Sequence, residues 1–98
     1  MDNQTHKIFI DYFRDKHQKI LSQPYLVNWG KDIQIMKSIL TLYGGYKTKQ
    51  LIDAYFVAVL EDPFLKSAGA SVGIFKSQIP KLLMQINEKQ KDENKGRL

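Results

Sequence analysis

The 98-residue chain contains no cysteine and only two histidines. Without cysteine, disulfides and thiolate metal sites are excluded, and a reducing compartment fits this composition. His6 and His17 are eleven residues apart, which is not the four-residue spacing of a metal-binding pair on a helix. We therefore expect neither a bound metal nor another cofactor.

Long apolar runs and catalytic motifs are also missing. No stretch approaches the roughly 18 consecutive apolar residues of a membrane-spanning helix, and residues 1–6 do not begin a secretory signal. Ser71 and Ser77 lack the sharp-turn motif of a catalytic nucleophile. The segments Gly44-Gly45 and Gly69-Ala70-Ser71 lack the strand context of a phosphate-binding loop. We expect a cytoplasmic protein that is not an enzyme and has no membrane partner.

Six glycines and three prolines are few, and they separate segments in which apolar residues recur every three or four positions. This spacing predicts an all-α fold, a single compact bundle of four to five helices. The predicted elements are a helix ending before Pro24, a second over about 31–43 stopping at Gly44-Gly45, a third capped by Thr48, a short turn from Pro63 and a last helix after Ser71.

Pro80 lies inside the last apolar pattern, so we expect the final helix to be kinked or broken there. From Glu88 onward the apolar periodicity is lost. We therefore assign residues 1–87 to one helical domain and residues 88–98 to a flexible charged tail.

The chain is basic, with 15 Lys and Arg against 10 Asp and Glu and a net charge of +5. Such a balance attracts nucleic acid, an acidic protein surface or an anionic membrane. The alternative is a mildly basic surface that has no target. Because the lysines are spread along the chain, only the fold decides whether they converge.

Four features favour nucleic acid. Lys76, Ser77 and Gln78 follow one another on the predicted last helix, where lysine suits phosphates while serine and glutamine suit phosphates or base edges. Trp29 could stack on a base, and Lys31 stands near the free N–H groups of a helix N-terminus. The candidate site is completed by further charge from two lysines, Lys37 and Lys81.

Each feature has a plainer interpretation. The polar residues of the last helix would then form its solvated outer face, and Trp29 would fill the core. Asp32 would cap the second helix. Asp53, a polar residue within the third apolar pattern, is either solvated or an acid that is buried or binds a partner.

Three segments carry a resemblance to a known family, namely Trp29-Gly30-Lys31-Asp32, Leu51-Ile52-Asp53-Ala54-Tyr55-Phe56 and Ser71-Val72-Gly73-Ile74-Phe75-Lys76-Ser77-Gln78-Ile79. Over about residues 8–83 the chain resembles a small helical domain of phage and prophage proteins. There it forms the C-terminal part of replication, or replisome-organiser, proteins. The resemblance implies a role in mobile-element DNA replication, and its matching polar positions are Lys31, Asp32, Lys76, Ser77 and Gln78.

The leading hypothesis is therefore a non-enzymatic DNA-binding domain associated with phage or mobile-element DNA replication. The alternative is a protein interaction adaptor, which recruits a replicative helicase or inhibits a host complex. The sequence leaves open the strandedness of the DNA, its target sequence and the oligomeric state.

Overall fold

The protein is all-α, as the spacing of its apolar residues predicted. The computed structural model describes the backbone of residues 3–67 and 69–96 and the side chains of residues 5–67 and 69–87. The prediction of a compact bundle of four to five helices is confirmed, because the described ranges form four helices: α1 (Asn3–Leu21), α2 (Trp29–Glu61), α3 (Pro63–Ser67) and α4 (Val72–Gly96).

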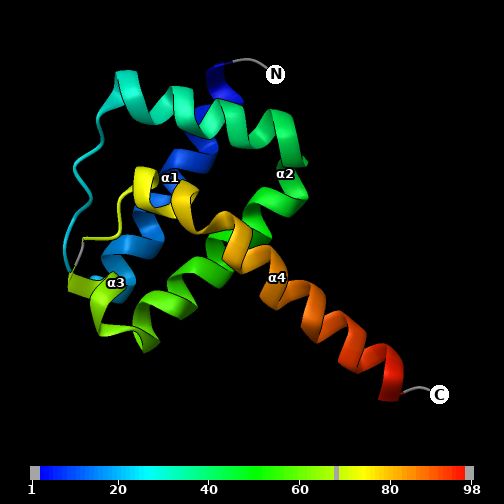
Figure 1. The fold of residues 1–98 in the computed structure, drawn as a ribbon. Helices are drawn as coiled ribbons and strands as arrows, with labels where there is room; N and C mark the ends of the chain where they lie inside the picture. Colours follow the sequence, from blue (N-terminus) through cyan, green and yellow to red (C-terminus); the bar gives the residue numbers. More distant parts are fainter. Residues whose placement is uncertain (1–2, 68, 97–98) are drawn as a thin grey trace.

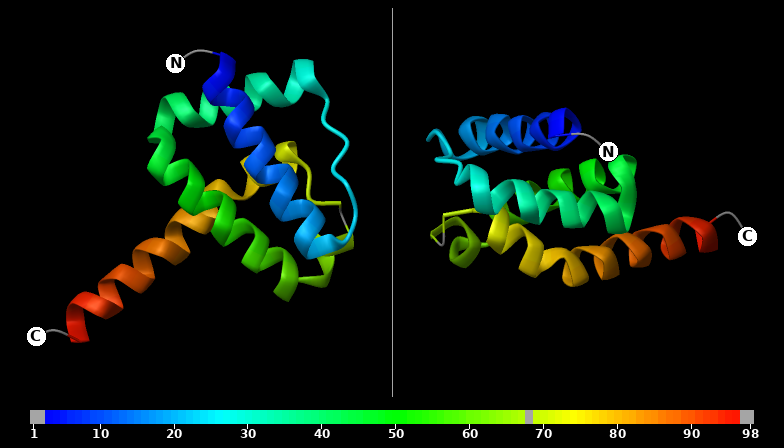
Figure 2. Two further views of the ribbon diagram at one scale, coloured as in Figure 1. Left: turned by 180° about the vertical axis from the view of Figure 1, so that it is seen from behind. Right: turned by 90° about the horizontal axis from the view of Figure 1, so that it is seen from above.

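The three long helices are stacked in layers with α2 in the middle. Figure 2 shows α1 on one side of α2 and α4 on the other. α2 bends at Gly44 into a first arm, residues 29–43, and a second arm, residues 45–61. The arms run in different directions (Figure 1), so this one helix forms the whole middle layer.

The core is built around Phe13 of α1, which is fully buried. Its ring centroid lies 6.2 Å from that of Tyr55 and 4.9 Å from that of Phe56, both on the second arm. It lies 5.7 Å from Phe75 of α4 and 5.4 Å from Tyr25 in the segment between α1 and α2. Aromatic pairs at these separations stabilise a core beyond the area that they bury. Phe13 therefore holds all three layers together.

The bend at Gly44 corrects the prediction of two helices joined by a turn. Gly44 has φ 81° and ψ 168°, a conformation open to glycine, and the helix resumes directly after it. The predicted cap Thr48 lies inside the second arm, where its hydroxyl donates to the Gly44 carbonyl oxygen at 2.7 Å. Thr48 therefore holds the bend from within the helix instead of starting a new one.

α4 confirms one prediction and corrects another. Ser71 caps the helix, because its Oγ accepts a hydrogen bond from the backbone N–H of Ile74 at 3.1 Å. Of the kink or break predicted at Pro80, the break is wrong, since α4 continues through this residue, and the kink stays a prediction. Pro80 leaves the carbonyl of Lys76 without its helical donor, and both residues are exposed, so water can take the donor's place.

α4 also continues past residue 87 to Gly96 and leads away from the body of the molecule (Figure 1). Helix is therefore present in residues 88–96, where the loss of apolar periodicity predicted an irregular segment. Residues 97 and 98 lie outside the described residues. The flexibility expected of residues 88–98, and the boundary at residue 87, stay predictions.

Candidate functional site

The residues predicted to bind nucleic acid fall on several parts of the surface. One part is a groove between the first arm of α2 and the start of α4, which we call the α2–α4 groove. Lys76 is the one charged residue of its lining, which consists of Ser38, Ile39, Leu42, Tyr43, Lys76, Ile79 and Pro80.

Two predicted lysines of the first arm lie next to the α2–α4 groove. Lys37 lines a shallow hollow that shares Ser38 and Leu42 with the groove. Lys31 precedes Ser38 by seven residues, about two helical turns, and so lies on the same face of the arm. The fold therefore gathers Lys31, Lys37 and Lys76 on one face, although 45 positions separate the first from the last along the chain.

These three lysines are exposed, and none has an ion-pair partner within the part of the chain that the structure describes. Neither hollow includes an Asp or Glu among its described lining residues. The lysines of α1 differ, because Lys16 and Lys19 lie 3.7 Å and 2.9 Å from carboxylates. The charge on the α2–α4 face is thus free to attract an anionic ligand.

Gln78 and Lys81 lie elsewhere, although both are on α4. They line a hollow of about 270 Å³ that also includes Glu61 and Asp62, at the end of the second arm. The two acidic residues offset the charge of Lys81, so this hollow does not extend the basic face.

Ser77 is exposed, but its hydroxyl is used within α4. Its Oγ donates to the carbonyl oxygen of Ile74 at 2.6 Å. Because the hydroxyl proton is used in this bond, the oxygen can act only as an acceptor, and a phosphate needs a donor. The structure therefore gives Ser77 no evident role beside Lys76.

Trp29, the first residue of α2, packs toward α1 and is not part of the α2–α4 groove. The guanidinium carbon of Arg14 lies 5.9 Å from the centroid of its ring, in cation–π contact. The indole is 43% exposed, so it is not a core residue, and it is absent from the groove lining that contains Lys76.

Asp32 is part of the scaffold. It is 4% exposed, and its Oδ2 accepts hydrogen bonds from the hydroxyl of Tyr25 at 2.6 Å and the backbone N–H of Asn28 at 3.0 Å. The same hydroxyl accepts from the N–H of Val72 at 3.2 Å, which links the start of α2 to the start of α4. Burial and the bond to Asp32 raise the pKa of Tyr25 to about 12.

The start of α2 is closed by its own side chains. Asn28 is the N-cap, and its side chain accepts from the N–H of Lys31 at 3.3 Å. The Asp32 carboxylate supplies negative charge at the helix N-terminus. From the sequence, the free N–H groups near Lys31 were expected to attract an anionic ligand. In the structure the Asp32 carboxylate already provides the negative charge there, so only the ammonium group of Lys31 remains available to a ligand.

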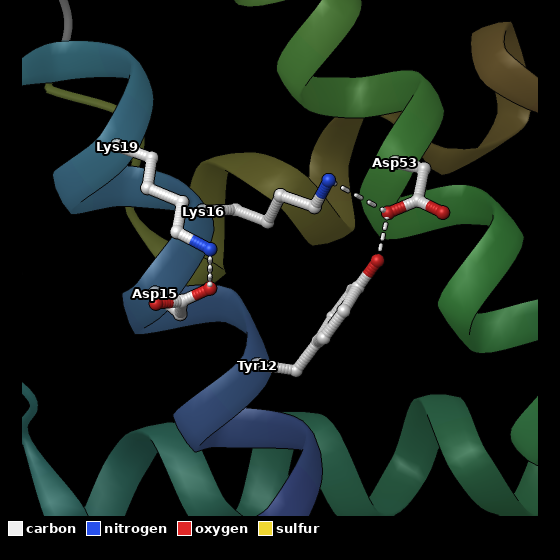
Figure 3. A network of polar contacts seen from close by, with 5 residues as sticks. All are labelled: Tyr12, Asp15, Lys16, Lys19 and Asp53. Atoms are coloured by element: carbon white, nitrogen blue, oxygen red, sulfur yellow. Dashed lines mark hydrogen bonds and ion pairs between the residues drawn. The ribbon is translucent and has the colours of Figure 1, made fainter.

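A polar network joins α1 to the second arm of α2 (Figure 3). The hydroxyl of Tyr12 donates to Asp53, and the ammonium of Lys16 lies 3.7 Å from the same carboxylate. The ammonium groups of Lys16 and Lys49 lie 5.7 Å and 5.6 Å from the centroid of the Tyr12 ring. Burial, followed by the bond to Asp53, raises the pKa of Tyr12 to about 12. Asp53 is therefore a half-buried link between helices.

Sequence reasoning missed the apolar part of the α2–α4 groove. Tyr43 and Ile79 were assigned to core-facing stripes, which is where they lie in part. Leu42 carried a usable signal, because it falls outside the predicted apolar face of its helix and is 73% exposed in the structure. A large apolar side chain next to unpaired lysines marks the groove.

Both histidines are buried, and no group of three or more His, Cys, Asp or Glu residues able to hold a metal occurs in the described chain. The ring nitrogens of His17 lie 2.8 Å from the carbonyl oxygen of Gln23 and 3.4 Å from that of Gly69. This places the ring between two connecting segments. Among the described residues, no helix is long and apolar enough to cross a membrane.

Comparisons of the chain with protein-family models, with curated proteins and with solved structures find no match. Any assignment of function consequently depends on the α2–α4 groove and on the sequence motifs described above.

Proposed function

We propose that the protein is a non-enzymatic DNA-binding domain that acts in the cytoplasm, in the replication of a phage or another mobile element. The α2–α4 groove, with Lys31, Lys37 and Lys76, is the contact surface. The observation that carries the proposal is three exposed lysines on one face that have no ion-pair partner among the described residues. The link to replication comes from the resemblance of the sequence motifs.

The first test is the affinity for labelled DNA, measured by fluorescence anisotropy at about 50 mM salt and above. Three lysine–phosphate contacts predict that log K falls with log salt with a slope between about −2 and about −3, because counterions are released on binding. Absence of binding to single-stranded and double-stranded DNA at the lowest salt would overturn the proposal.

The second test compares two double variants of equal charge. Lys37→Ala with Lys76→Ala removes two unpaired lysines of the α2–α4 face and should weaken binding about tenfold, while the salt slope becomes shallower by about 2. Lys16→Ala with Lys19→Ala removes two lysines that already have carboxylate partners. If the second pair weakens binding as much as the first, only the net charge matters and the α2–α4 face is not the site.

The groove also supports a second candidate function, a protein interaction adaptor. The exposed apolar lining residues Leu42 and Pro80 suit an amphipathic segment, and the lysines favour an acidic one. The partner would be a replicative helicase or a host complex. A nuclease-treated pull-down distinguishes the two functions: a stoichiometric partner that survives nuclease and is lost with Lys37→Ala and Lys76→Ala supports the adaptor.

A further inference from the structure

The α2–α4 groove is a hollow of about 240 Å³ between the first arm of α2 and the start of α4. Lys76 lines it together with an aromatic side chain, that of Tyr43. Stacking on such a ring requires an unpaired base, which a single strand offers and an intact duplex does not.

Reading a duplex would instead require a protruding helix face that carries several free polar side chains. On α4 these would be Lys76, Ser77 and Gln78. Ser77 is bonded to its own helix, and Gln78 lies in the hollow with Glu61, on another side of α4 from the groove. The structure offers no such reading face at the predicted positions.

Aromatic side chains accompany the lysines. Tyr43 lines the α2–α4 groove together with Lys76. Three residues later, just past the bend at Gly44, Tyr46 is 88% exposed. Aromatic rings beside unpaired cations are the surface on which single-stranded DNA binds, with bases stacked on rings and phosphates on lysines.

We propose that the α2–α4 groove binds single-stranded DNA in preference to duplex DNA. Bases stack on Tyr43 and Tyr46, and phosphates contact Lys37 and Lys76. This inference rests on the proposed function and specifies its ligand.

The test uses the full chain and fluorescence anisotropy with three probes: an oligothymidylate of about 15 nucleotides, a duplex hairpin of equal phosphate count, and the RNA counterpart of the oligothymidylate. Single-stranded DNA should bind at least about tenfold more tightly than the duplex at the same salt. Tighter binding of the duplex overturns the inference while the proposed function stands, and preferential binding of the RNA overturns the DNA assignment. No binding of any probe overturns both proposals.

Two exposed aromatic residues provide matched variants. Tyr46→Ala should weaken binding to the single strand by about fivefold or more, and Tyr46→Phe, which keeps the ring, should bind like the natural chain. Phe64→Ala removes a ring that is 74% exposed on α3, away from the groove lining, and should change nothing. Because both side chains are exposed, the variants should fold, which thermal unfolding checks. If Tyr46→Ala and Phe64→Ala behave alike, stacking of a base on Tyr46 is refuted.

Discussion

At the scale of single residues, His6 is the least satisfied side chain of the core. It is 1% exposed, and neither ring nitrogen has a hydrogen-bond partner among the described residues. A buried polar group without a partner keeps the cost of its lost hydration, whereas an apolar side chain of similar size does not have this cost.

His6→Leu should therefore raise the free energy of unfolding by about 1 kcal/mol, measured by urea denaturation. His6→Ala should lower it, because truncation of a fully buried side chain leaves a cavity. If His6→Leu destabilises the protein as much as His6→Ala does, the imidazole of His6 makes a stabilising interaction and is not an unsatisfied group.

Asp32 represents the opposite case, a buried polar side chain whose partners are all provided. Asp32→Ala should lower the free energy of unfolding by about 2 to 3 kcal/mol, since it leaves the Tyr25 hydroxyl and the Asn28 N–H without their acceptor. Asp11→Ala, which removes an exposed carboxylate 3.4 Å from Arg14, is the matched control and should have little effect in the same urea titration. If Asp32→Ala and Asp11→Ala lowered the free energy of unfolding equally, the structural role of Asp32 would be refuted.

Sequence reasoning could anticipate part of this. It offered Asp32 as the cap of the second helix, whereas the N-cap is Asn28 and Asp32 lies in the first turn of α2, where a carboxylate is favoured. Its partner could not be identified, because Tyr25 lies in an irregular segment and reaches Val72, 47 residues further along the chain. Local patterns carry no information on contacts of that kind.

At the scale of elements, the bend of α2 depends on a single glycine. An alanine at position 44 would meet no atom within 4 Å, so the cost of Gly44→Ala comes from the backbone conformation alone. We expect a loss of about 1 to 3 kcal/mol in the free energy of unfolding, or a straighter α2 that separates the first arm from α4.

Gly30→Ala is the control for this variant. Gly30 lies in the first turn of α2, where an added Cβ makes only an ordinary contact with Asn28 at 3.9 Å. Alanine there should stabilise the protein by about 0.5 to 1 kcal/mol, because it restricts the unfolded chain. The free energy of unfolding of both variants is measured by chemical denaturation. If Gly44→Ala stabilised the protein, the backbone conformation at the bend would not require glycine.

The helices themselves could be predicted from the sequence, because the period of the apolar residues follows from the geometry of the α-helix. The connections between them could not. Gly44-Gly45 indicates that the helix is interrupted, but it does not say whether a loop or a sharp bend follows. Thr48 is equally suitable as an N-cap and as a donor to the Gly44 carbonyl. Packing of the two arms against α1 and α4 makes the choice.

At the scale of the whole molecule, three tyrosines make the free energy of unfolding depend on pH in the alkaline range. Burial raises the pKa of Tyr12, Tyr25 and Tyr55 from 10.0 to about 12. The folded state thus favours the neutral hydroxyl. Its stabilising contribution is complete below the unfolded pKa, near 10, and is lost as the pH rises through about 12.

The free energy of unfolding should therefore fall steadily above about pH 10, as measured by urea denaturation at successive pH values. Tyr25→Phe should be less stable near neutrality but lose less on the way to high pH, since one ionising group is gone. A pH profile of Tyr25→Phe parallel to that of the natural chain would contradict this assignment.

The candidate site was predictable only as a set of residue types. Lys31, Lys37 and Lys76 were named from the sequence, but their convergence results from the packing of α4 against the first arm of α2. The separation of Lys81 from this group has the same origin, because α4 turns it toward Glu61 and Asp62. Charge is visible in a sequence, whereas its neighbours across the fold are not.

The position of Phe13 has a consequence for any attempt to divide the molecule. One ring contacts the connecting segment, the middle layer and the last helix, so no pair of neighbouring helices can be excised with a complete interior. Loss of α1 would expose the aromatic centre at once. We therefore expect the protein to unfold as a single cooperative unit.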